Sequence, residues 1–86
     1  MKKCGSFKAK GYRIYVYANK RLSCERARRV MKARWGPSSG IVTHNGGTGA
    51  SGWITLKKYP GWKCYSGAGG GTCRKSKAVA GYQSRV

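Results

Sequence analysis

The chain has 86 residues, with 19 lysines and arginines against one acid, Glu25, and a formal net charge of +18. This length accommodates one small domain, which we predict to span residues 1–86. With one acid and one histidine, the chain has no carboxylate pair, catalytic triad or carboxylate metal cluster. We therefore expect no enzyme, no small-molecule substrate, no cofactor and no metal. No apolar run approaches the roughly 20 residues of a membrane-spanning helix.

The first predicted element is a strand over residues 12–18, where apolar and polar side chains alternate. Its inward positions are Tyr12, Ile14, Val16 and Ala18. Tyr15 and Tyr17 fall on the opposite face, next to Arg13. Tyrosine beside arginine can stack on bases or sugar rings, or lie at a lipid headgroup layer. We therefore count Tyr15 and Tyr17 among the candidate binding residues.

An amphipathic helix is predicted over residues 24–35, with Ser23 as its N-cap and Glu25 in its first turn. One face is apolar and ends at Trp35, which we expect to anchor the helix on a sheet. The rest of the helix is strongly basic. Its candidate binding residues for an anionic partner are Arg26, Arg28, Arg29, Lys32 and Arg34.

Residues 36–52 are rich in glycine and predict a flexible loop that contains one short strand over 41–43. Further strands are predicted over 53–56 and 78–82, with a hairpin between them that pairs 62–65 with 72–74. These elements predict an α+β fold in which one amphipathic helix packs on a small antiparallel sheet.

Four widely spaced cysteines, Cys4, Cys24, Cys64 and Cys73, lack the close pairs and neighbouring histidine of zinc sites. They predict two disulfides, and therefore an oxidising compartment outside the cytosol. Each bridge is expected to add roughly 2–4 kcal/mol to so small a domain. Three pairings are possible, and we favour a bridge from Cys24 to Cys64 or Cys73, which ties the helix start to the hairpin.

Four short segments form a pattern along the chain. They are Cys4-Gly5 before a strand, the helix start Ser-Cys-x-x-Ala-Arg-x-Val at residues 23–30, Gly61-Trp62-Lys63-Cys64, and Cys73-Arg74-Lys75-Ser76. This pattern resembles that of small secreted actinobacterial proteins. The resemblance implies export and disulfides, and it implies no particular activity. Met1-Lys2-Lys3 is not followed by an apolar stretch, so we expect a secreted domain whose signal peptide has been removed.

The excess of cations predicts an anionic partner, because the chain has almost no acid with which to neutralise them. Our leading hypothesis is a secreted cationic antimicrobial, or bacteriocin-like, protein that binds anionic lipid or wall polymer of bacterial envelopes. An alternative is a basic nucleic-acid-binding module, whose binding would be mainly non-specific. A third hypothesis is a non-enzymatic glycan-binding protein of the cell wall that uses Trp53, Trp62 and Tyr15.

Overall fold

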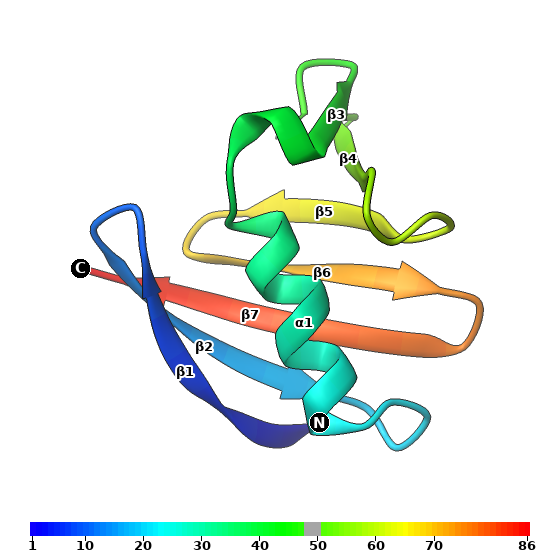
Figure 1. Cartoon of the computed structure of the whole chain (residues 1–86). Helices are drawn as coiled ribbons and strands as arrows, with labels where there is room; N and C mark the ends of the chain where they lie inside the picture. Colours follow the sequence, from blue (N-terminus) through cyan, green and yellow to red (C-terminus); the bar gives the residue numbers. More distant parts are fainter. Residues whose placement is uncertain (48–50) are drawn as a thin grey trace.

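The computed structural model describes residues 1–47 and 51–86, and shows helix α1 (Cys24–Arg34) packed on one face of a seven-stranded antiparallel sheet. The other elements are β1 (Lys2–Ala9), β2 (Tyr12–Ala18), the short 3-10 helix η1 (Ser38–Gly40), β3 (Ile41–His44), β4 (Trp53–Leu56), β5 (Lys63–Gly67), β6 (Gly70–Lys75) and β7 (Ala78–Arg85). The strand order across the sheet is β1-β2-β7-β6-β5-β4-β3. Figure 1 shows α1 crossing the sheet, with β3 and β4 beyond one end of the helix. The expected α+β arrangement is present, with a larger sheet than the sequence indicated.

Alternate residues of each strand point to opposite faces of the sheet. We call the face covered by α1 the inner surface and the opposite face the outer surface. On β2, Ile14 and Val16 are buried beneath the helix, and Tyr15 lies on the outer surface. Tyr12 was expected in the core but is 41% exposed, because it lies at the hairpin end of β2, where its ring packs against Trp35 at a centroid distance of 6.0 Å.

The helix begins as its sequence predicts. The Ser23 hydroxyl accepts a hydrogen bond from the backbone N–H of Arg26 at 3.2 Å, which caps the first turn. Trp35 follows the last helical residue, and its ring meets that of Tyr82 on β7 edge-on at 5.4 Å. Trp35 therefore anchors the helix on the sheet, as expected. The apolar side chains that the helix buries are Ala27, Val30 and Met31.

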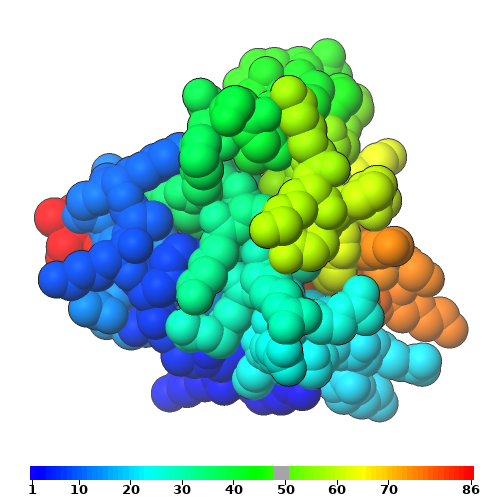
Figure 2. All heavy atoms as spheres, in the orientation of Figure 1, coloured from blue at the N-terminus to red at the C-terminus, as the bar shows by residue number. Residues whose placement is uncertain are grey.

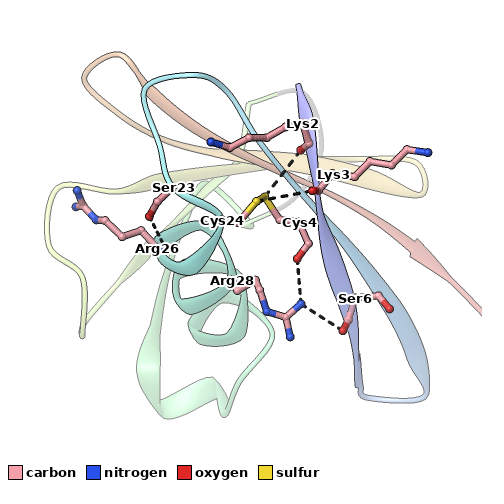
Figure 3. Close-up of a disulfide and its surroundings, with 8 residues drawn as sticks. All are labelled: Lys2, Lys3, Cys4, Ser6, Ser23, Cys24, Arg26 and Arg28. Atoms are coloured by element: carbon pink, nitrogen blue, oxygen red, sulfur yellow. Dashed lines mark hydrogen bonds between the residues drawn. A yellow bond between two sulfur atoms is a disulfide. The ribbon is translucent and has the colours of Figure 1, made fainter.

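The sequence did not predict β1, and this strand decides the disulfide pairing. Because β1 and β2 form a hairpin, the chain doubles back and brings Cys4 beside Cys24 at the start of α1. These two cysteines form a disulfide with their Cα atoms 5.0 Å apart (Figure 3). The favoured bridge from Cys24 to Cys64 or Cys73 is therefore wrong. The helix start is tied to β1 instead.

The second disulfide joins Cys64 and Cys73, which are directly paired positions of β5 and β6. Both side chains are fully buried on the inner surface. All four cysteines are thus paired, as the spacing predicted.

Within the predicted loop over 36–52, residues 38–44 form η1 and β3, so the short strand expected over 41–43 is present. β3 pairs along its whole length with β4. The His44 ring stacks on the Trp53 ring at 5.0 Å, and its Nε2 lies 3.1 Å from the Thr55 hydroxyl. These contacts join the end of β3 to β4. Residues 48–50 of the predicted loop lie outside the described residues.

Candidate anion-binding groove

Arg28, one of the five helix cations expected to bind an anionic partner, fastens the helix to β1 instead. Its Nη1 donates to the backbone carbonyls of Cys4 at 3.1 Å and Ser6 at 3.4 Å (Figure 3). Gly5, between them, lies in an irregularity of the β1–β2 register and has a φ of +85°. A Cβ atom at Gly5 would lie 2.8 Å from this same nitrogen. Arg28 is therefore half-buried and engaged in holding the fold.

Arg34 is buried, with an exposed fraction of 8%. Its Nη2 donates to the Ser66 hydroxyl at 2.9 Å, and that hydroxyl lies 3.0 Å from the Tyr82 hydroxyl. The guanidinium carbon is 5.4 Å from the Trp35 ring centroid and 5.8 Å from that of Tyr82, so two aromatic rings take the place of a carboxylate partner. Arg34 is therefore buried within the domain and is not one of the helix cations exposed to an external partner.

The three remaining helix cations, Arg26, Arg29 and Lys32, are exposed. A spacing of three residues places neighbours along one side of a helix. The Lys32 ammonium turns towards β1, where it lies 6.0 Å from the Phe7 ring centroid. Arg26 and Arg29 are therefore the main helix charges on the side of α1 that faces away from β1.

This side of α1 borders a groove whose far wall is the connection between β4 and β5. A hollow of about 340 Å³ is lined by residues that include Arg29, Lys32, Lys58 and Tyr59. A smaller hollow of about 80 Å³ adjoins it and shares Arg29 and Tyr59 with it. Figure 2 shows the connection, in yellow-green, directly beside the helix. We call this feature the helix groove and define it by Arg26, Arg29, Lys32, Lys58 and Tyr59.

The charge of the helix groove is almost entirely uncompensated. Glu25, the sole acidic side chain, forms an ion pair with Arg29 one helical turn away. This pair is exposed and solvated, so it neutralises Arg29 only in part. Arg26 and Lys58 have no carboxylate side chain left in the sequence to pair with.

The tyrosines expected to act with the helix cations lie on the other side of the sheet. Tyr15 is exposed and Tyr17 half-buried, and both point to the outer surface. The structure therefore separates the predicted binding residues into two groups, with the helix and the sheet between them.

Lys58 and Tyr59 are the groove residues that sequence reasoning missed. A Lys57-Lys58-Tyr59 run before Pro60 was the available signal, but nothing local indicated that it would face α1.

The two tryptophans of the glycan hypothesis, Trp53 and Trp62, are covered wholly or in part. Trp62 is only 2% exposed, and one face of the Trp53 ring is covered by His44.

Among residues 1–47 and 51–86, no group of three metal-binding side chains comes together, and no helix has the length and apolarity to cross a membrane. Comparison of the chain with models of protein families, with curated proteins and with solved structures finds no match. The function is therefore inferred from the residues and their geometry.

Proposed function

We propose that the protein is a secreted, non-enzymatic cationic antimicrobial protein that binds the anionic polymers and lipids of bacterial envelopes through the helix groove. The observation that carries this proposal is the placement of cations from α1 and from the β4–β5 connection along two adjoining hollows. Arg29 and Lys58 line the larger hollow, and Arg26 and Arg29 line the smaller one. Cations from two separate elements thus border one groove open to solvent. Such a recess suits phosphate groups, which arginine and lysine both bind.

The charge balance supports the same partner. The chain carries a net charge of +18, and such self-repulsion opposes the compact state. An anionic surface relieves this repulsion, and each basic residue near it contributes about 1 kcal/mol of binding. Two disulfides suit a small domain that works in an oxidising compartment.

We propose adhesion at the level of the phosphates rather than insertion into lipid. The large apolar side chains that are exposed in the described part of the chain are Met1, Tyr12, Tyr15, Val42, Tyr65 and Val86. None of them lines the helix groove. The groove therefore offers charge to a headgroup layer without an apolar wedge beside it.

The test replaces Arg26, Arg29 and Lys58 together by Gln and measures binding to vesicles that contain phosphatidylglycerol, together with growth inhibition of bacteria. Three charges at about 1 kcal/mol each predict a loss on the order of a hundredfold in vesicle affinity. Growth inhibition should fall with it. All three side chains are exposed, so the melting temperature should change little.

The matched control replaces Lys10, Lys20 and Lys77 by Gln, which removes the same charge from three exposed turns outside the groove. We expect this variant to lose less than about tenfold, because its lysines are dispersed and lie farther from a bound phosphate. Equal losses in the two variants would show that net charge alone drives adhesion. A folded groove variant that binds and kills as well as the parent would contradict the proposal.

A further inference from the structure

The outer surface of the sheet exposes tyrosines that the helix groove does not use. Tyr15 and Tyr65 are 37% and 43% exposed, although they belong to different strands, β2 and β5. Tyr17 stands next to Tyr15 on the same face, and its hydroxyl donates to Gln83 at 3.3 Å. Since α1 packs on the inner surface, these rings face solvent on the far side of the molecule.

The strand register shows what lies between these rings. Tyr17 pairs with Gly81, Gly81 with Thr72, and Thr72 with Tyr65, so one row crosses four strands. Three strand spacings separate the two tyrosines of this row by about 14 Å. The next row runs from Tyr15 through Gln83 to Gly70 and Gly67.

Small side chains therefore occupy most of the space between the tyrosines of β2 and Tyr65. Gly70 cannot be replaced without movement, because a Cβ atom there would lie 2.9 Å from the Tyr82 carbonyl oxygen. The Met1 side chain reaches over Gly81 and covers the part of this area next to Tyr17. The result is a shallow floor with aromatic rings on two sides.

Cations flank the floor at both ends. Arg13 and Arg85 are paired neighbours beside Tyr15, and Lys63 and Arg74 are paired neighbours beside Tyr65. Glu25, the one acidic side chain, lies on α1 and therefore on the other side of the sheet. Flat rings between arginines and lysines match a ligand that alternates flat rings with negative charges.

We propose that this outer surface is a second binding site, independent of the helix groove, and that it takes a single-stranded nucleic acid. Bases would stack on Tyr15, Tyr17 and Tyr65, and phosphates would meet the flanking cations. A neutral glycan explains the rings but not the four cations. A lipid surface explains the cations, but apart from the tyrosines Met1 is the one large apolar side chain seen to be exposed at this site in the described residues.

The test compares a labelled oligothymidylate with an abasic strand of equal length, which has the same phosphates and no bases. Fluorescence anisotropy at physiological salt should show that the parent protein prefers the oligothymidylate by about tenfold or more. Tyr15→Leu and Tyr65→Leu should each reduce this preference severalfold, and Tyr15→Phe and Tyr65→Phe should preserve it. The groove variant with Arg26, Arg29 and Lys58 replaced by Gln should weaken both strands equally and keep the preference.

A second measurement does not depend on the variants folding. Addition of the oligothymidylate to isotope-labelled protein should shift backbone resonances at the outward positions of β2, β5, β6 and β7, whereas the abasic strand should shift them less. The proposal is overturned if the parent binds both strands equally, or if the leucine variants fold and keep the preference. It is also overturned if a neutral chitin oligosaccharide displaces the oligothymidylate, which would make this surface a glycan site.

Discussion

The inner and outer surfaces of the sheet are built by alternate residues of the same strands, yet they differ in almost every property. On β2, Ile14 and Val16 have lost nearly all contact with solvent, whereas Tyr15 between them is exposed. The inner surface and α1 together bury apolar side chains and one arginine of the helix, Arg34. The outer surface holds rings, glycines and cations against solvent. One strand can therefore stabilise the fold with one face and remain free to bind with the other.

The largest difference between the two surfaces should appear in stability. Ile14→Ala removes a fully buried side chain beneath the helix and should lower the free energy of unfolding by about 3 kcal/mol. Tyr15→Ala, one residue along, should change it by about 0.5 kcal/mol or less. Chemical denaturation of both variants measures the contrast. Similar losses would show that Tyr15 packs as a core residue.

The bridge that ties α1 to β1 should have an effect almost as large. Replacing Cys4 and Cys24 together by Ala opens a loop whose ends are 20 residues apart, and should lower stability by about 3 kcal/mol. Proteolytic mapping of the unreduced parent should recover Cys4 linked to Cys24, and Cys64 linked to Cys73. Any other linkage would contradict the position of β1 beside the start of α1.

Two arginines of the same helix sharpen the comparison further. Arg34→Ala removes a buried guanidinium from two aromatic rings and from Ser66, and should lower stability by about 2 kcal/mol. Vesicle affinity should then stay within about twofold of the parent. Arg29→Ala should do the reverse, with little change in stability and about a fivefold loss of vesicle affinity. If both variants lost stability and vesicle affinity to the same extent, the distinction between a buried arginine and a binding arginine would be wrong.

The smallest effect is expected at Gly5. Gly5→Ala places a side chain at a φ of +85° and near the Arg28 guanidinium, which can shift because it is the end of a flexible chain. We expect a loss of about 1 kcal/mol, measured by thermal unfolding. In a double variant that carries both Gly5→Ala and Arg28→Ala, the melting temperature should fall by less than the sum of the falls in the two single variants. Simple additivity would mean that Gly5 and Arg28 act independently.

Local signals sufficed for much of the fold. The alternation of β2, the Ser23 cap and the hairpin between β5 and β6 each depend on neighbours in the sequence. The sequence did not indicate β1, because the irregularity at Gly5 interrupts its alternation. The disulfide pairing was missed for the same reason, since it depends on the return of the chain through that hairpin.

The candidate site was harder to predict, because contacts with residues far away in the sequence decide which cations are held within the fold and which are exposed. A helical wheel places Arg34 among the buried Ala27, Val30 and Met31, but it does not indicate which groups hold the guanidinium there. The carbonyls that hold Arg28 come from β1, and Ser66 and Tyr82, which hold Arg34, come from β5 and β7. Lys58 joins the groove from a connection whose path no local pattern describes.

The two ends of the sheet have a consequence for how copies of the protein behave together. An open sheet has edge strands, here β1 and β3, and unpaired edges can join other chains. Lys2, Lys3 and Lys8 on β1, together with the irregularity at Gly5, hinder such pairing, and the charge of +18 keeps copies apart. If the protein binds an anionic polymer as proposed, the polymer would cancel this repulsion while it gathers many copies along its length. Self-association would then be favoured at the place where the protein is most concentrated.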